Sequence, residues 1–436
     1  MERLERIKEW LIYLFIFLLP WQTRLILRAG ELNGGYWEYG TYSVYAIEIL
    51  LWIIIVFSVV ETAGRKFKIK NLKLKITIQN EKLFYVVGGL LLIGIISAVR
   101  ALSPTLAFCW LGRFFEGVAI FLIIKYSRVD FKKLCWAFVA GAVVQAGLGI
   151  WQFAAQTVVA SKWLGMAGQD ASVLGVSVVE SGAGRFLRAY GGLPHPNILG
   201  VYLLMAIVLL SYIFIVLSNK KKSATMIFIM CYVLLVTCLF LTFSRAAWLG
   251  LLIILLFFIF TPSPHPLPRG EGNKRIIFIV FILFFAFYIF AFWPLASARV
   301  NGVDRLEVKS TAERISGYGQ AWQIIQKHPV LGVGPGNYTL AVYKEIDASQ
   351  PAWFYQPVHN VFLLAWAETG IFGFLFFLGF LVFALRFVIA KSDNYRAAAI
   401  PLILIFLFLF DHFFWSLPFG LWLSWSIMGT TIKMQN

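Results

Sequence analysis

The sequence has few charged residues for its length. Only 14% of its 436 residues are charged, whereas 60% are hydrophobic. A soluble domain has about 25% charged residues, so this composition excludes an ordinary water-soluble protein. Apolar runs recur along the chain, each about as long as the ~20 residues that a helix needs to cross a bilayer. These runs are continuous and not alternating, which also excludes a transmembrane β-barrel.

Cysteine is scarce as well. The four cysteines, Cys109, Cys135, Cys231 and Cys238, lie in or beside apolar runs. They form no CxxC pair or other metal-ligand spacing, so we predict that they are small buried apolar residues. The sequence also has no Asp-x-Asp motif and no cluster of histidine and cysteine that would hold a metal ion. We therefore predict chemistry that uses neither a metal nor a cofactor.

The net charge of +17 is carried mainly by short loops between the apolar runs. Every second loop is basic, which is the pattern of membrane topology and not of a nucleic-acid-binding face. We therefore predict no nucleic-acid partner and place both termini in the cytoplasm. The first apolar run lacks a small-residue cleavage site, which indicates a retained helix and not a signal peptide.

The fold class predicted from these runs is an all-α membrane protein with about twelve transmembrane helices and a long outward-facing loop that contains short amphipathic helices. The strict alternation of basic and other loops fits this number, because one missed helix would break it. The predicted spans are residues 10–27, 44–60, 83–99, 107–125, 134–156, 197–217, 225–243, 246–261, 275–295, 359–390, 396–411 and 415–432.

The predicted organisation is a single transmembrane domain over residues 1–436 with two long outer loops, residues 157–196 and 296–358. Residues 262–274 are rich in proline and glycine and are predicted to be a cytoplasmic linker. In the second loop, the stretch from Ser310 to Glu313 has the form of a capping box. It predicts an amphipathic surface helix that begins there and ends before KHPVLGVGPGN.

Five features with reactive or charged side chains fall on the outer side of this topology. They are RAYGGLPHPN (residues 188–197), FSRAAW with Arg245, Arg314 in the surface helix, GVGPGNY (residues 332–338) and His359-Asn360. An outward arginine opposes the usual inward bias, so Arg245 needs an anionic partner. His359 can act as a general base near neutral pH. Arginines bind phosphate oxygens in a two-pronged geometry, so this set suits a reaction with a diphosphate leaving group.

Other charged residues favour structural roles. Arg113 and Glu116 are three residues apart and are predicted to pair with each other inside the bundle. Asp411 and His412 are predicted to form a structural ion pair at the last outer junction. His328 lies in a His-Pro turn, for which we also favour a structural role.

Taken together, these stretches resemble the O-antigen ligase and polymerase family of membrane glycosyltransferases. The resemblance is carried by R-x-x-GGLPHPN, SRAAWLG, the Glu313-Arg314 pair followed by Trp322, G-x-GPGNY and HN-x-x-L-x-x-x-x-ETG. It implies an inverting, metal-independent transfer of a glycan from an undecaprenyl-diphosphate donor to the hydroxyl of a lipid A-core or similar surface acceptor. His359 would be the general base, and Arg245 and Arg314 would bind the diphosphate.

The resemblance also implies that Arg188, His195, Asn197, Asn337 and Asn360 contact substrate. It implies a multi-pass protein of the cell inner membrane, with its active site facing the periplasm and with membrane lipid, the lipid-linked donor and the glycan acceptor as its partners. Two alternatives stay open. One is a polysaccharide polymerase that uses a lipid-linked repeat unit as the acceptor. The other is a transporter of lipid-linked sugars, although transporters usually place their polar groups near the bilayer midplane.

Overall fold

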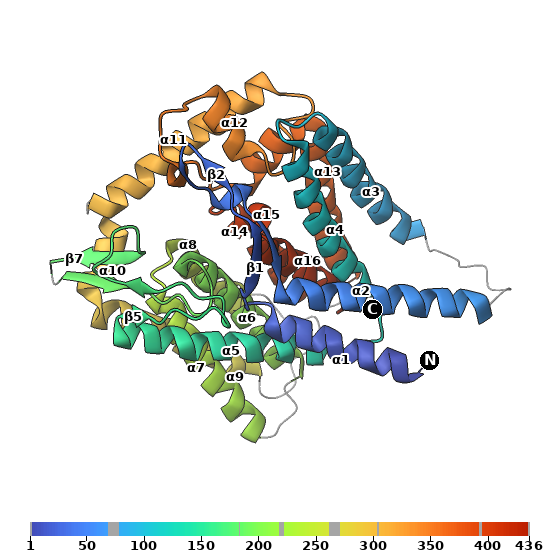
Figure 1. Cartoon of the computed structure of the whole chain (residues 1–436). Coiled ribbons are helices and arrows are strands. Elements are labelled where there is room, and N and C mark those ends of the chain that lie inside the picture. The colour runs from blue at the N-terminus through green and yellow to red at the C-terminus, as the bar shows by residue number, and fades with distance from the viewer. Residues whose placement is uncertain are drawn as a thin grey trace.

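The structure is a computed structural model that describes residues 2–68, 78–182, 184–217, 222–260, 271–302, 305–391 and 395–434. Apolar helices make up most of it (Figure 1). The helices are α1 (Glu2–Leu18), α2 (Ala46–Lys68), α3 (Ile78–Val99), α4 (Pro104–Tyr126), α5 (Phe131–Ala155), α6 (Pro196–Leu217), α7 (Lys222–Leu241), α8 (Arg245–Phe260), α9 (Glu271–Ala291), α10 (Trp293–Asn301), α11 (Arg305–Lys327), α12 (Tyr338–Glu345), α13 (Val361–Lys391), α14 (Ala399–Phe408), α15 (Phe413–Ser416) and α16 (Pro418–Lys433).

Short antiparallel strand pairs lie in the connections between helices. They are β1 (Arg24–Arg28) with β4 (Tyr42–Tyr45), β2 (Glu31–Leu32) with β3 (Gly35–Tyr36), β5 (Thr157–Val158) with β6 (Gln169–Asp170), and β7 (Val178–Ser181) with β8 (Gly184–Leu187). The predicted span 10–27 is therefore wrong at its end, because helix α1 ends at Leu18 and strand β1 begins at Arg24. Arg24 and Arg28 pair with Tyr45 and Tyr42, which turns this segment into a hairpin.

Each predicted span contains a helix, but the number of membrane crossings is not confirmed. Among the described residues, five helices are long and apolar enough to cross a membrane, or six if the bent pair formed by α9 with α10 and α11 counts as one. They are Ala46–Ala63, Pro104–Tyr126, Phe131–Ala155, Pro196–Phe214 and Val361–Ala390. Apolar helices of 10–17 residues account for other predicted spans, among them Thr225–Leu241 and Arg245–Phe260. The structure therefore confirms a mostly helical protein of the membrane class.

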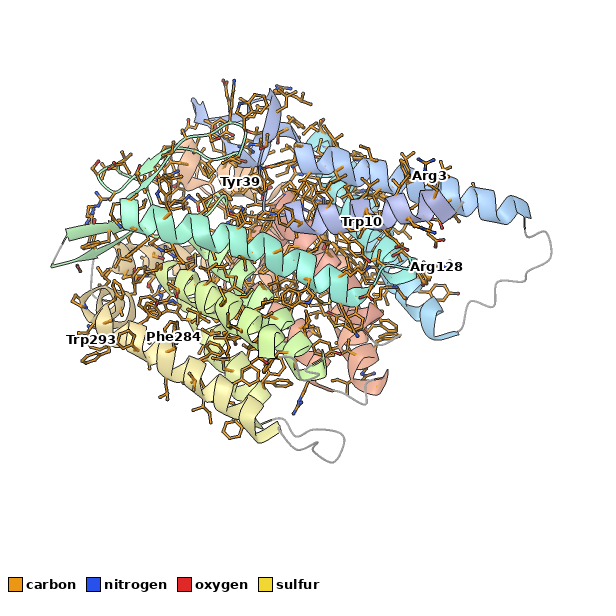
Figure 2. The ribbon with its side chains drawn as sticks, turned by 90° about the horizontal axis from the view of Figure 1, so that it is seen from below. Arg3, Trp10, Tyr39, Arg128, Phe284 and Trp293 are labelled. Carbon is orange, nitrogen blue, oxygen red and sulfur yellow. The ribbon has the colours of Figure 1, made fainter. Side chains whose placement is uncertain are left out.

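The chain ends and several loops define one end of the bundle. Arg3 and Arg128 lie there, and Trp293 lies at the opposite end (Figure 2). Arg128 is 3.2 Å from Glu5, and Lys433 donates to the carbonyl of Ser127 at 2.6 Å. These contacts bring helix α1, the α4–α5 loop and the C-terminal helix together.

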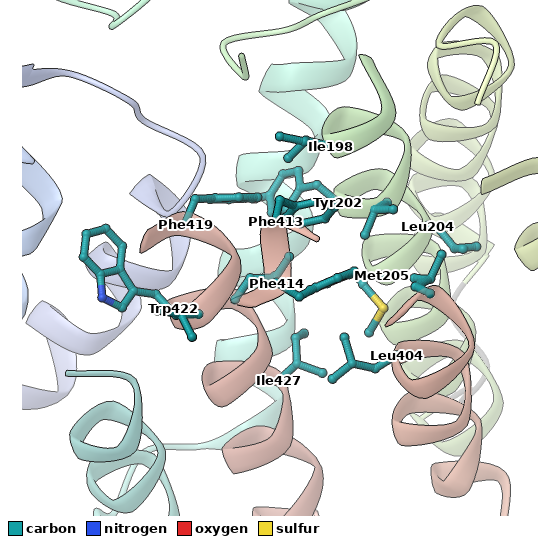
Figure 3. Packing of buried hydrophobic residues seen from close by; sticks show 14 of the residues in the cluster. Ile198, Tyr202, Leu204, Met205, Leu404, Phe413, Phe414, Phe419, Trp422 and Ile427 are labelled. Carbon is teal, nitrogen blue, oxygen red and sulfur yellow. The ribbon is translucent and has the colours of Figure 1, made fainter. Parts of the chain in front are cut away.

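Helix α6 is the centre of the core, since 89% of its candidate span is buried. Tyr202, on this helix, packs against Phe138 of α5 with ring centroids 4.7 Å apart. Figure 3 shows Tyr202 and Met205 facing Phe414 of α15 and the side chains of α16. The last three helices therefore pack on α6, which brings residues 409–417 close to the segment that precedes α6.

Helix α13 is bent at Gly370, where the backbone has φ of 65° and ψ of −172°. A side chain there would clash, since an added Cβ would lie 2.1 Å from the carbonyl oxygen of Val330. The bend frees carbonyl groups of α13, and they accept hydrogen bonds from the GVGPGN loop: Val333 donates to Ala367 at 3.0 Å and Gly334 to Glu368 at 2.9 Å. The loop is thereby fixed along the outer part of α13.

The surface helix α11 ends at Lys327, one residue beyond the predicted end, but it begins at Arg305. The stretch from Ser310 to Glu313 therefore lies inside the helix, and its interpretation as a capping box is wrong. Trp322 of α11 contacts Trp366 of α13 with ring centroids 6.0 Å apart, which places α11 over the outer part of the bent helix. Of the predicted linker 262–274, residues 262–270 lie outside the described residues.

Candidate functional site

The site is assembled around the tight turn between α7 and α8. Phe243 in this turn has a left-handed backbone with φ of 46°, so the carbonyls of Thr242 and Phe243 do not continue the helix. Arg188, which precedes α6, donates from Nε to the Thr242 carbonyl at 2.7 Å and from Nη2 to Asn197 Oδ1 at 2.6 Å. Only 5% of Arg188 is exposed. Arg188 and Asn197 therefore hold the turn against the start of α6.

Two further arginines share one buried carboxylate. Glu307, in the first turn of α11, lies 3.2 Å from Arg245 Nη1 and contacts Arg299 of α10 directly. Arg299 also donates from Nε to the Phe243 carbonyl at 3.0 Å. Arg245 thus has the anionic partner that its outward position predicts. Its side chain remains 39% exposed, whereas that of Arg299 is 11% exposed.

Arg314 completes a cluster of four arginines, which we call the arginine cluster: Arg188, Arg245, Arg299 and Arg314. Burial lowers the pKa of Arg188 to about 10, and the positive charges of Arg245 and Arg314 contribute to this shift. Burial and the other three arginines likewise lower the pKa of Arg299 to about 8. Glu307 is the carboxylate paired with this cluster in the described chain, so the cluster has excess positive charge.

Arg314 differs from the other three because it makes no hydrogen bond or ion pair with the residues that the structure describes. It is half-exposed and lies in the third turn of α11, whereas the predicted helix start at Ser310 would place it in the first turn. A guanidinium without a protein partner in such a cluster is available for a phosphate or carboxylate ligand.

His359 lies directly before α13 and faces Asp411. Its Nδ1 is 3.5 Å from Asp411 Oδ1, and this buried nitrogen has no closer partner among the described residues. Burial raises the pKa of Asp411, but the hydrogen bond and the charge of His359 outweigh it, so the pKa lies below its usual value. An ionised Asp411 favours the tautomer with the proton on Nδ1 and leaves Nε2 as the basic atom. The His359 side chain is 29% exposed, which lets a substrate approach it.

Two other histidines surround this pair. The His412 ring lies 5.0 Å from that of His359, and its Nδ1 is 2.7 Å from Ser416 Oγ. Burial lowers the pKa of His412 to about 3. His195 is fixed by Ser177 Oγ at 2.8 Å, and desolvation, followed by the charge of Arg188, lowers its pKa to about 3. Both rings are therefore neutral near pH 7. The ring nitrogen nearest to the ionised carboxylate is Nδ1 of His359, at 3.5 Å, whereas Nε2 of His412 is 3.9 Å away.

The structure thus brings together most of the residues that the sequence singles out, but it gives the asparagines structural contacts. Asn360 Oδ1 accepts from the backbone N–H of Leu363 at 3.1 Å and begins α13 as a helix cap. Asn337 is fully buried, and its amide bonds the backbone of Ser103 at 2.8 and 3.2 Å. Asn337 therefore attaches the GVGPGN loop to α4 and makes no hydrogen bond to a histidine in the described part of the chain.

Sequence reasoning missed three of the residues at the site. Arg299 has no motif of its own, and only its place in the large outer loop could have drawn attention to it. Asp411 and His412 were predicted to be a structural ion pair, and the structure instead places them against His359. Only their predicted position could have indicated a role in the site, since they lie at an outer junction on the same predicted side as His359.

The predicted ion pair between Arg113 and Glu116 is wrong. Glu116 accepts hydrogen bonds from the indole N–H groups of Trp52 at 2.7 Å and Trp422 at 3.0 Å. Arg113 instead donates to the Ser43 carbonyl at 3.0 Å. Indole donors can satisfy a buried carboxyl group without a second charge, which explains why the pair does not form.

His359, Asp411 and His412 could also hold a metal ion, since one donor atom from each lies within 4.8 Å of the others. Imidazole nitrogen and carboxylate oxygen are common ligands of zinc and related ions. The same three residues suit a base that is oriented by a carboxylate, because Nδ1 of His359 faces Asp411. A metal site predicts that a chelator abolishes activity, whereas a histidine base oriented by a carboxylate predicts that a chelator has no effect.

Replacing Arg188 by alanine is expected to destabilise the fold by about 2–5 kcal/mol, because it leaves the Thr242 carbonyl and the Asn197 amide without their buried donor. Thermal unfolding of the purified protein in lipid nanodiscs measures the effect. Arg128→Ala is the matched control, since that side chain is 72% exposed. An unchanged melting temperature in Arg188→Ala, together with weaker substrate binding, would make Arg188 a ligand contact and not a structural residue.

Comparison with known families adds an independent finding. Residues 230–378 match the O-antigen ligase family, which confirms the resemblance found in the motifs. The matched range includes Arg245, Arg299, Arg314 and His359, whereas Arg188, His195 and Asp411 lie outside it. No curated protein matches the chain. The family match indicates a membrane enzyme of the ligase or glycosyltransferase type.

Proposed function

Because residues 230–378 match the O-antigen ligase family, we propose that this protein transfers a glycan from an undecaprenyl-diphosphate donor to a hydroxyl group of a lipid A-core or similar surface acceptor. The observation that carries the proposal is the position of His359, which is backed by Asp411 and lies beside an arginine cluster with excess positive charge. The site would face the periplasm from the inner membrane, with both chain termini in the cytoplasm.

In the proposed reaction, Nε2 of His359 removes the proton from the acceptor hydroxyl, and Asp411 stabilises the resulting imidazolium. The hydroxyl oxygen forms a bond to the anomeric carbon of the donor glycan as the bond from that carbon to the diphosphate oxygen breaks. The electron pair leaves with the diphosphate, and attack from the opposite face inverts the anomeric carbon. Arg314 and Arg245 neutralise the charge that develops on the leaving diphosphate.

The remaining predicted substrate contacts have positioning roles in this proposal. Arg188 and Asn197 hold the α7–α8 turn whose carbonyl anchors Arg299, and Asn360 fixes the start of α13 beside His359. His195 stays neutral and is tied to Ser177, so it lines the site without acting as a base. The GVGPGN loop, attached by Asn337, covers one side of the site.

The test of the function is the size of the glycan on each lipid in cells that lack the protein. Long polymer on the polyprenyl carrier together with a bare surface acceptor is the expected result for a ligase. Single repeat units on the acceptor without long chains would identify a polymerase, which uses the same donor chemistry. No change in either pool would contradict both enzymes and favour transport of lipid-linked sugars.

Transfer by the purified enzyme is expected to continue in the presence of a chelator such as EDTA, because the arginines replace a metal in neutralising the leaving group. The assay compares initial rates before and after chelation and dialysis. Loss of activity that zinc or manganese restores would instead make His359, Asp411 and His412 metal ligands.

A further inference from the structure

A cavity of about 340 Å³ adjoins the site but is lined by none of the four arginines. Its walls come from the N-terminal hairpin, the outer ends of α2 and α4, the GVGPGN loop and α13. The residues that carry the argument are Tyr39, Glu48, Trp52, Trp110, Arg113 and Glu116. We call it the hairpin cavity, after the strands β1 and β4 that enclose it.

Three residues connect the hairpin cavity with His359 and His412. Ser416 lines the cavity and is the partner of His412 Nδ1 at 2.7 Å. Tyr39 also lines it, and its ring lies 5.9 Å from that of His412. Pro357 lines it two residues before His359. A molecule in the cavity would therefore lie next to the base that the proposed reaction requires.

The lining has the composition of a saccharide site. Tyr39 and Trp52 offer aromatic faces, on which the apolar face of a sugar ring packs. Three carboxyl groups, from Glu48, Glu116 and Glu368, are set against the one guanidinium of Arg113. The oxygens of Glu116 and Glu368 already accept hydrogen bonds within the protein, so Glu48 is the carboxylate left to accept from sugar hydroxyl groups. A phosphate group would meet more carboxyl groups than guanidinium groups in this lining.

One lining residue has an unused hydrogen-bonding group. Thr339, in α12, is 2% exposed, and its hydroxyl has no hydrogen-bond partner among the described residues. A buried hydroxyl without a partner costs free energy unless a ligand or water satisfies it. This observation is independent of the charge of the cavity and indicates that a polar ligand belongs there.

The hairpin cavity lies between helices whose outer faces are apolar. On α2, Ile49 is 55% exposed and Trp52, which also lines the cavity, is 43% exposed; on α4, Phe108 is 49% exposed next to the lining residue Cys109. A membrane protein presents such faces to lipid. A ligand with a lipid anchor could therefore place its head group in the cavity while its chains remain in the bilayer.

From these observations we propose that the hairpin cavity binds the uncharged saccharide head group of a lipid-anchored acceptor and discriminates against phosphorylated sugars. The inference rests on the proposed function and deepens it. The arginine cluster takes the anionic donor, and the hairpin cavity takes a neutral acceptor. The acceptor sugar would then be free of phosphate at the residue that receives the glycan.

The test measures binding without any donor, using the full-length protein in lipid nanodiscs and the fluorescence of its tryptophans, two of which line the cavity. The probes are decyl β-D-glucoside, its 6-phosphate and decanol. Gly112→Leu is the blocking variant, because Gly112 lines the cavity and an added Cβ there meets open space. Gly147→Leu is the matched control, a helical glycine with equally open space that does not line the cavity.

We expect saturable binding of the neutral glucoside to the wild type and to Gly147→Leu, and binding at least about tenfold weaker for Gly112→Leu and for the phosphorylated probe. Thr339→Val should weaken binding by about three- to tenfold without lowering the melting temperature, since it removes only an unused hydroxyl. Thr431→Val, which changes a buried threonine in α16 that does not line the cavity, should bind normally.

Three results would overturn the inference. Equal binding by Gly112→Leu and the wild type would place the glucoside elsewhere. Equal or tighter binding of the phosphorylated probe would contradict the charge argument, and equal binding of decanol would identify a lipid-chain site. If the protein binds the glucoside saturably but transfers no glycan, the saccharide site is supported and only the proposed function is overturned.

Discussion

Glycan transfer by His359→Ala is expected to fall by about 10²–10⁴-fold, because the acceptor hydroxyl loses the base that removes its proton. The protein should still fold and insert, since the side chain of His359 is 29% exposed and its nearest polar partner is Asp411 at 3.5 Å. The measurement is the initial rate of transfer from a lipid-linked donor in nanodiscs, with the melting temperature recorded for each variant.

The matched control is His328→Ala, since His328 pairs with Glu345 at 3.0 Å and is not part of the site. Asp411→Asn should lower kcat with little change in KM, because it keeps the shape of the carboxylate but removes the charge that stabilises the imidazolium. Full activity of a folded His359→Ala protein would exclude His359 as the base.

Arg314→Ala is expected to lower transfer by about 10²–10³-fold, the usual loss when one donor to a developing negative charge is removed. Its effect on stability should be small, because Arg314 has no ion-pair partner in the described part of the chain. This separates it from Arg245 and Arg299, whose removal also leaves the buried carboxylate of Glu307 with one partner fewer. Transfer rates and melting temperatures of purified variants measure both effects.

Arg305→Ala serves as the control on the same helix, since Arg305 is 72% exposed and contacts Glu180 at 3.2 Å. Arg314→Lys should recover only part of the activity, because lysine lacks the planar fork that binds two oxygens at once. Normal transfer by Arg314→Ala would remove Arg314 from the diphosphate site and leave Arg245 as the exposed donor.

The positions of the helices were predictable because bilayer thickness sets the length of an apolar run, and each predicted run contains a helix. The ends were less predictable. Strand pairing between residues 24–28 and 42–45 ends the first span early, and the ion pairs of Glu307 draw the start of α11 back to Arg305. Neither effect is visible in local hydropathy, because both depend on hydrogen bonds and ion pairs with other segments of the chain.

For the site, the sequence predicted which residues lie together. It did not predict which of them have structural roles and which are available to substrate. Arg188 and Arg314 both occur in the motifs that carry the family resemblance. Only their burial in the structure distinguishes the structural arginine, Arg188, from the one that can bind a ligand, Arg314. The role of Asp411 was hidden because its partner, His359, is 52 positions earlier in the chain. The hairpin cavity was also beyond prediction, since its lining comes from segments that are far apart in the sequence, from Leu27 to Ser416.

The bend at Gly370 divides α13 into parts of unequal length. The inner part, residues 371–390, would be about 30 Å long at 1.5 Å per residue, which equals the thickness of the hydrocarbon core of a bilayer. The outer part, residues 361–369, adds about 14 Å. If the inner part fills the hydrocarbon core, hydrophobic matching alone sets the height of His359, at the level where lipid head groups carry their phosphates and first sugars. A thinner or thicker membrane would then shift the base relative to its lipid-linked substrates, so lipid chain length should influence turnover.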